Sequence, residues 1–263
     1  MKKAVPYLIL ILLFAAAGWY FFTGEPDAVH ELPPPRPVPV IPVEPEQAEQ
    51  PVVELIERTL PETEPEVVPE PLPALNESDP EFRQELSGMV GANPLAVYVV
   101  KDHVISRMVS TLDSLMARQV PAEINPVKPA DDEFIVETDG ERTVMSPENF
   151  ARYDGYVALL NGMDAGSLII TYQRYAPLFQ EAWEENGGEG DFDDRLVEVI
   201  DHLLTTPDVP PPVYLVKPEA VYLFEEPALE SLSAGQKILI RMGSANAAIV
   251  KEKLTDIRSE IKP

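Results

Sequence analysis

The chain contains no cysteine and only three histidines among its 263 residues. Without cysteine it can form no disulfide, and its N-terminus cannot carry a lipid attached at a cysteine. Structural and catalytic zinc sites use mainly cysteine and histidine, and His30, His103 and His202 supply no dense ligand set. The sequence therefore predicts a domain stabilised by its packed core, with no metal and no cofactor.

Motifs of common enzyme classes are also absent. The chain has no G-x-S-x-G nucleophile motif, and residues 233–237 (SAGQK) do not form the glycine-rich loop that binds phosphate. Asp201 and His202 are adjacent, but neighbours on a helix point about 100° apart, so this aspartate would not orient the imidazole for catalysis. We therefore assign no catalytic residue.

Basic residues are scarce, since 20 Lys and Arg stand against 45 Asp and Glu, giving a formal net charge of -25. The acidic excess is spread along the chain and is not confined to a tail. A chain of this charge repels nucleic acid and anionic lipid headgroups. We expect no nucleic-acid partner, and we expect the charge to serve mainly solubility.

An apolar run occupies residues 4–22, directly after Lys2 and Lys3. A helix of this length, at about 1.5 Å per residue, spans the roughly 30 Å hydrocarbon core of a bilayer. The basic residues before the run place residues 1–3 in the cytoplasm, so the rest of the chain lies outside. Ala15 and Ala17 also fit a cleavage site, which leaves a cleaved signal peptide as the alternative. We expect an uncleaved anchor in the inner membrane, because more apolar residues follow that site.

Residues 23–77 are rich in proline and glutamate and have no hydrophobic periodicity. Proline lacks an amide donor and restricts the residue before it, so this segment cannot form helices or central strands. We interpret it as an extended, disordered spacer at about 3.1 Å per residue. The remaining residues, 78–263, are long enough for one domain with its own core.

The domain is predicted to be mainly α-helical, a multi-helix fold with one or two small β-hairpins. Helices are expected from Asp79-Pro80, over 94–118, from Ser146-Pro147 to Gly162, over 164–185, and from Asp191 to before Pro207. Pro177 should kink or break the fourth of these, since an interior proline removes a hydrogen bond. Two further helices should follow Ser233 and Ser244, separated by Gly243.

The hairpins are predicted from turn residues. Asp139-Gly140 lies between alternating apolar residues and indicates a two-residue type I′ turn. Two short β-type runs flank Lys217-Pro218-Glu219, and their prolines confine them to the margin of a sheet.

Several strings in the domain are distinctive, among them LNESDPEF, RYDGYVALL, YQRYAPLFQEAW, VIDHLLTTP, VYLFEEPALESLSAGQK and RMGSANAAIVKEKLTDIR. With them the chain resembles an uncharacterised family of Gram-negative bacterial proteins that have one N-terminal membrane anchor. The resemblance covers essentially the whole domain and implies an inner-membrane protein with a periplasmic helical domain. It implies no activity, substrate or ligand.

Polar residues inside these strings form our candidate site. Because basic residues are scarce, several of them on helices that pack together indicate either ion pairs between helices or a groove for a peptide, glycan or carboxylate. An aromatic residue, Tyr175, has the same two interpretations, core packing or a ligand platform. The candidates are Arg152, Arg174, Tyr175, Asp201, His202, Gln236, Lys237, Arg241 and Asn246.

Two classes of function remain open. The first is a tethered, non-catalytic binding or scaffolding module, in contact with the bilayer through residues 4–22 and with an envelope protein or the cell wall through its domain. The second is a periplasmic hydrolase that acts on an envelope polymer through paired carboxylates. A cleft in which one acid is desolvated while another stays ionised would favour the hydrolase.

Overall fold

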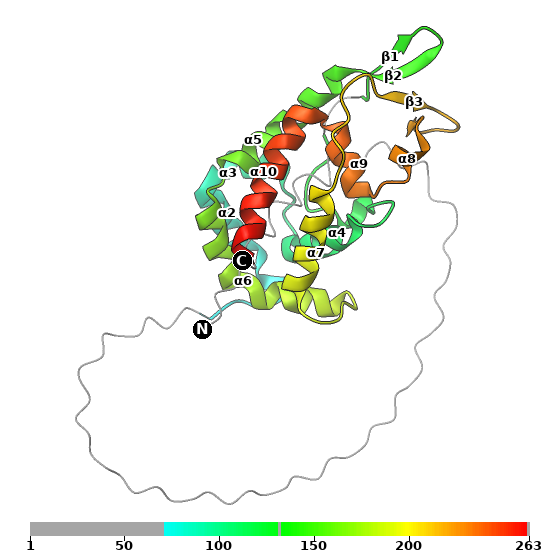
Figure 1. The fold of residues 1–263 in the computed structure, drawn as a ribbon. Coiled ribbons are helices and arrows are strands. Elements are labelled where there is room, and N and C mark those ends of the chain that lie inside the picture. Colours follow the sequence, from blue (N-terminus) through cyan, green and yellow to red (C-terminus); the bar gives the residue numbers. More distant parts are fainter. Residues whose placement is uncertain (1–70, 131–132, 262–263) are drawn as a thin grey trace, which may run out of the picture. The chain divides into compact units, whose positions relative to one another are not determined.

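The computed structural model describes residues 71–130 and 133–261, which form a mainly helical domain with one small antiparallel sheet (Figure 1). Its elements in chain order are η2 (Leu75–Glu77), α2 (Asp79–Val90), α3 (Ala92–Tyr98), α4 (Val104–Ser114), η3 (Ala122–Ile124), β1 (Val136–Asp139), β2 (Arg142–Met145), η4 (Pro147–Tyr153), α5 (Asp154–Gly162), α6 (Ala165–Glu185), α7 (Phe192–Leu204), β3 (Tyr214–Val216), β4 (Leu223–Phe224), α8 (Pro227–Glu230), α9 (Ala234–Arg241) and α10 (Gly243–Ile261).

The main core is built around α4, which packs against α6 and α7, while α10 packs against α7 and α5 (Figure 1). Aromatic rings fill the space between α2, α6 and α7. The ring of Phe82 meets those of Tyr175 and Phe179 edge-on, at centroid distances of 4.9 and 5.9 Å. Edge-to-face pairs of this kind add to the stabilisation from buried apolar area.

The single helix expected over 94–118 is wrong, because the chain forms α3 and α4 with an extended break between them. At the break, Val99 pairs with Val127, and the amide of Val100 donates to the carbonyl of Pro126 at 2.9 Å. Two β-branched valines in this segment favour such pairing over helix, and the partner strand comes from a loop that periodicity cannot reveal.

A side chain from another helix caps the start of α4. His103 precedes α4 with a left-handed φ of 56°, and its own side chain makes no capping bond. The carboxylate of Asp79, in the first turn of α2, accepts from the amides of His103 at 2.6 Å and Val104 at 2.8 Å. Asp79 therefore satisfies donors that a local N-cap residue normally satisfies.

Pro177 lies inside α6, which continues to Glu185, so of the two alternatives expected at this proline, a kink or a break, the structure excludes the break. The cost of one missing backbone bond is about 3 kcal/mol. Burial on both sides of the proline offsets this cost, since Tyr172 and Tyr175 precede it and Phe179 follows it within the core.

Both expected hairpins form, and they join into one four-stranded sheet in the order β1-β2-β3-β4. The junction pairs Val144 with Tyr214. In the first hairpin Asp139 pairs with Arg142, so the turn residues are Gly140, with φ of 64°, and Glu141. A positive φ at the first turn residue alone is the pattern of a type II′ turn, so the expected type I′ is wrong.

The sheet has a small core of its own and lies near α8 and α9 (Figure 1). Ile240 of α9 contributes to this core, together with four residues of the sheet and its approach: Met145, Val213, Leu215 and Phe224.

The C-terminal helices follow each other closely. Ser233 and Gln236 form the reciprocal capping box that starts α9, as the position of Ser233 predicts. Helix α10 begins at Gly243, so the expected N-cap role of Ser244 is wrong. Gly243 has φ of 79°, and a Cβ there would lie 2.7 Å from Phe150, so both the turn and the close approach require glycine.

The predicted anchor and most of the spacer lie outside the described residues. Within 71–130 and 133–261, no helix is both long and apolar enough to cross a membrane. At the start of the described chain, Leu72 and Leu75 already pack against the main core.

Replacing Asp79 with Ala should destabilise the domain, because two amides at the start of α4 would lose their acceptor. We expect a loss of about 1–2 kcal/mol in the free energy of unfolding, measured by urea denaturation. Asp102→Ala is the control, since Asp102 is exposed near the same helix start. Equal stability of the two variants would contradict the capping role of Asp79.

Candidate functional site

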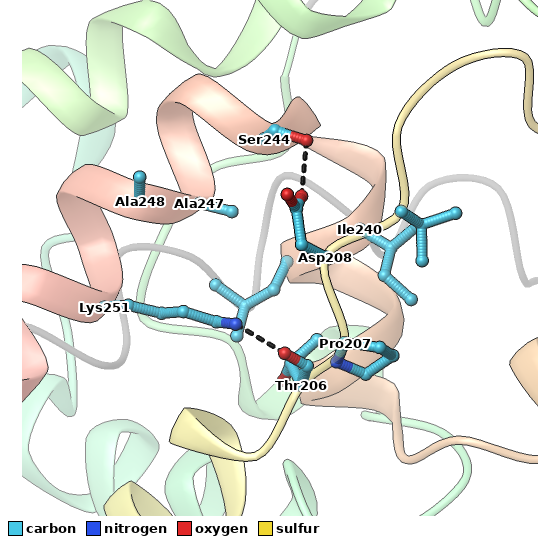
Figure 2. A pocket seen from close by; sticks show the side chains of 10 residues that line it. Thr206, Pro207, Asp208, Ile240, Ser244, Ala247, Ala248 and Lys251 are labelled. Carbon is cyan, nitrogen blue, oxygen red and sulfur yellow. Dashed lines mark hydrogen bonds between the residues drawn. The ribbon is translucent and has the colours of Figure 1, made fainter.

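A partly enclosed hollow of about 210 Å³ lies between α9, α10 and the loop that follows α7. Its lining is mostly apolar, since six of the ten lining residues are apolar and four are polar. It is formed by Thr206, Pro207, Asp208, Val209, Leu239, Ile240, Ser244, Ala247, Ala248 and Lys251 (Figure 2).

Local sequence explains how the loop reaches this position. Helix α7 ends at Leu204, and the Thr206 hydroxyl donates back to the carbonyl of Leu203 at 2.6 Å. Pro207 prevents the helix from continuing, so the chain leaves α7 in extended form. On the other side, the turn at Gly243 brings α10 back beside α9.

Two hydrogen bonds tie the loop to α10 on either side of the hollow (Figure 2). The Ser244 hydroxyl donates to a carboxylate oxygen of Asp208 at 2.5 Å. Two turns further along α10, the ammonium of Lys251 donates to the carbonyl of Thr206. A cation and an anion thus face one hollow from its two ends.

Two of the sequence-predicted candidates, His202 and Gln236, meet at the start of α9. His202 Nε2 lies 2.9 Å from the Ser233 hydroxyl, and the Gln236 amide donates to Thr205 Oγ1 at 3.2 Å. These contacts join the end of α7 to the capping box of α9, which gives both side chains a structural role.

Lys237 and Arg241 lie one turn apart on α9, and both are buried, with exposed fractions of 3% and 2%. The ammonium of Lys237 donates to Glu230 Oε1 at 2.8 Å, and the guanidinium of Arg241 lies 5.0 Å from the centroid of the Phe224 ring. Burial lowers the pKa of Arg241 to about 10, partly opposed by Tyr153 and Glu230, so Arg241 stays charged at neutral pH.

Glu230 connects this buried pair of cations to the sheet. Its second carboxylate oxygen, Oε2, accepts from the amide of Phe224 in β4 at 2.9 Å. One carboxylate of the short helix α8 therefore binds both the sheet and the buried ammonium of α9.

The remaining candidates lie apart from these groups. Arg174 of α6 pairs with Glu81 and Glu85 of α2, and burial next to those two acids raises the pKa of its neighbour Tyr175. Asp201 pairs with Arg258 at 2.7 Å.

Asn246 and Arg152 lie around η4. The Asn246 amide donates to the carbonyl of Phe150 at 3.1 Å and to Asp154 at 3.0 Å. Arg152 is half-buried, and its positive charge opposes the rise that burial causes in the pKa of Tyr153. The nine candidates thus lie at several separate helix contacts, and the structure does not bring them into one groove.

Sequence reasoning missed the residues that face the hollow. Asp208 lies 36 positions before Ser244, and Thr206 lies 45 positions before Lys251. Neither pair forms a motif, and in the sequence Ser244 is typical of a helix cap. The one local signal was Pro207, which fixes where α7 must end.

Two more open hollows flank the segment from Gly187 to Arg195. In one of them Arg195 pairs with Asp113 at 2.6 Å and with Glu198 at 2.5 Å. Both carboxylates are therefore engaged by one guanidinium. Across the part of the chain that the structure describes, no group of three or more histidines and carboxylates is placed to hold a metal ion.

The class that these features define is a mainly helical domain with a small sheet and a mixed apolar and polar hollow. A family model described as "Protein of unknown function (DUF3014)" matches residues 104–258, more than half of the chain. The protein belongs to this family. The hollow and all nine candidate residues lie within the matched region. No curated protein and no solved structure matches the chain.

Replacing Glu230 with Gln should destabilise the domain more than replacing an exposed acidic residue, because the buried ammonium of Lys237 would lose the carboxylate with which it pairs. The side chain of Glu230 is 26% exposed, so we expect a loss of about 2–3 kcal/mol in urea unfolding, below the full cost of breaking a buried pair. Glu226→Gln is the control, because Glu226 is exposed on the same segment.

A second substitution tests the cause of that loss. Adding Lys237→Met to the Glu230→Gln variant removes that buried ammonium, so the double variant should recover part of the lost stability. Additive losses from the two substitutions would refute the charge-compensation argument.

Proposed function

We propose that this protein is a membrane-tethered, non-catalytic binding module of the cell envelope. Residues 1–3 lie in the cytoplasm, 4–22 cross the inner membrane, the residues from 23 up to about 71 form a spacer, and the domain that follows, which includes the core residues Leu72 and Leu75, binds a partner in the periplasm. Lys2 and Lys3 before the apolar run support this orientation. The partner is an envelope protein or a cell-wall polymer, and the acidic charge disfavours nucleic acid.

The hollow beside α10 is the observation that supports a binding function. Ligand sites in proteins combine apolar walls with a few fixed polar groups. Here Leu239 and Ile240 form an apolar wall. Asp208 and Lys251 lie on either side of the hollow, and hydrogen bonds to Ser244 and to the carbonyl of Thr206 hold them in place. The volume of about 210 Å³ suits one side chain or a small molecule and is below that of drug-sized sites.

The same hollow gives less support to hydrolysis by paired carboxylates. Glycoside hydrolysis of the common kind needs two carboxyl groups on either side of the scissile bond. Asp208 is the one acidic residue in the lining of this hollow. Another hollow is lined by five acidic residues, of which Asp113 and Glu198 pair with Arg195 and Asp191 caps α7. Binding therefore accounts for the observed geometry with fewer assumptions.

The proposed topology can be tested with introduced cysteines, because the chain has none of its own. In intact spheroplasts, a membrane-impermeant maleimide should label Glu252→Cys, an exposed position on α10. Lys2→Cys should react only after lysis. Labelling of both positions, or of neither, in intact spheroplasts would contradict the proposed orientation.

The binding function predicts a partner at the hollow. A photo-crosslinking residue at Ala248, in the full chain in its native envelope, should trap one dominant species, identified by mass spectrometry. The control position is Glu181, exposed on α6 and outside the lining. The same pattern at both positions, or no crosslink at either, would count against the hollow as the binding site.

The spacer gives a second test of the same proposal. Deleting residues 31–70 removes roughly 120 Å of extended chain. If the partner lies far from the membrane, the crosslink at Ala248 should be lost while the unfolding midpoint of the domain stays unchanged.

A further inference from the structure

The hollow beside α10 presents a positive and a negative group that do not pair with each other. Asp208 and Lys251 both belong to its lining, and neither forms an ion pair within the described part of the chain.

Both charged groups retain hydrogen-bonding capacity. An ammonium has three donors, and Lys251 uses one of them on the carbonyl of Thr206. A carboxylate has about four acceptor sites, and Asp208 uses one for the Ser244 hydroxyl. These bonds fix the two groups in position and leave donors at one end of the hollow and acceptors at the other (Figure 2).

The wall between the two charges is apolar. Leu239 and Ile240 are 3% and 5% exposed, and Ala247 and Ala248 leave open the space that larger side chains on α10 would fill. The volume of about 210 Å³ is about seven times the ~30 Å³ share of one water molecule in the liquid. This is room for a small molecule with a short aliphatic body.

We infer that the hollow binds a small zwitterion, an α-amino acid with an aliphatic side chain. Its carboxylate meets the Lys251 ammonium, its ammonium meets Asp208, and its side chain lies against Leu239 and Ile240. A simple carboxylic acid or a simple amine would leave one of the two protein charges without a partner, which lowers its affinity. This inference rests on the proposed binding function and adds to it a small-molecule ligand at the hollow.

The test is calorimetric titration of the purified full chain with L-leucine. We expect saturable binding with a Kd of about 1 mM or lower. The two comparison ligands are 4-methylpentanoic acid and 3-methylbutylamine, which share the aliphatic body and lack one charge each. Each should bind at least about tenfold more weakly than leucine.

The chain offers a matched pair of lysines as variant and control. Lys253 lies on the same helix, is half-buried like Lys251, and donates to the carbonyl of Met163, away from the hollow. Lys251→Met should weaken leucine binding at least about tenfold, and Lys253→Met should leave it unchanged. Ala248→Leu, which fills the hollow and keeps both charges, should also abolish binding. Unfolding midpoints verify that each variant is folded.

No saturable leucine binding by the unmodified chain up to about 10 mM would overturn the inference, as would equal affinities of the two lysine variants. The proposed function fails separately. If Ala248 traps an envelope partner and leucine does not bind, the binding function stands and the ligand class is wrong. If leucine binds and no partner is trapped, the hollow is a small-molecule site and the proposal that an envelope partner docks on it is wrong.

Discussion

The carboxylate of Glu230 holds the two parts of this fold together. With one oxygen it accepts from β4, and with the other it binds a lysine of α9 that is almost fully buried. A buried ammonium is tolerated only with a partner, and Glu230 supplies a carboxylate partner where α9 packs between the sheet and the main core. The short helix α8 positions that carboxylate, which explains why such a small element is needed.

The position of the sheet in turn determines the hollow. Because β3 is paired to β2, the chain that leaves α7 must run past α10 to reach it. The loop contains Pro207 and Pro210, which keep it extended and without a helix of its own. Its ties to α10 are therefore made by side chains, through Ser244 and Lys251. The hollow remains open because the loop between α7 and β3 forms no helix or strand that would pack into it, and the side chains of the loop and of α10 give it its charges.

Features that depend on near neighbours were predictable from the sequence. Ser233 with Gln236 and Asp191 with its helix lie within one turn of the amides they cap, so the start of each helix is visible in the sequence. The break between α3 and α4 was not predictable from the sequence, because it depends on pairing between Val99 and Val127, which lie far apart in the chain. The hollow was missed for the same reason, since its polar contacts join residues at least 36 positions apart.

Because Asp79 of α2 caps α4, the folded domain must include residues that precede α4. The matched family region begins at residue 104, at the first residue of α4, and leaves out α2 and its buried Phe82 and Leu86. A fragment cut at that boundary would start with unsatisfied amides and an exposed aromatic cluster. The folding unit is therefore longer than the region matched by the family model, and within the described residues it includes the segment from Leu72, which packs against the core.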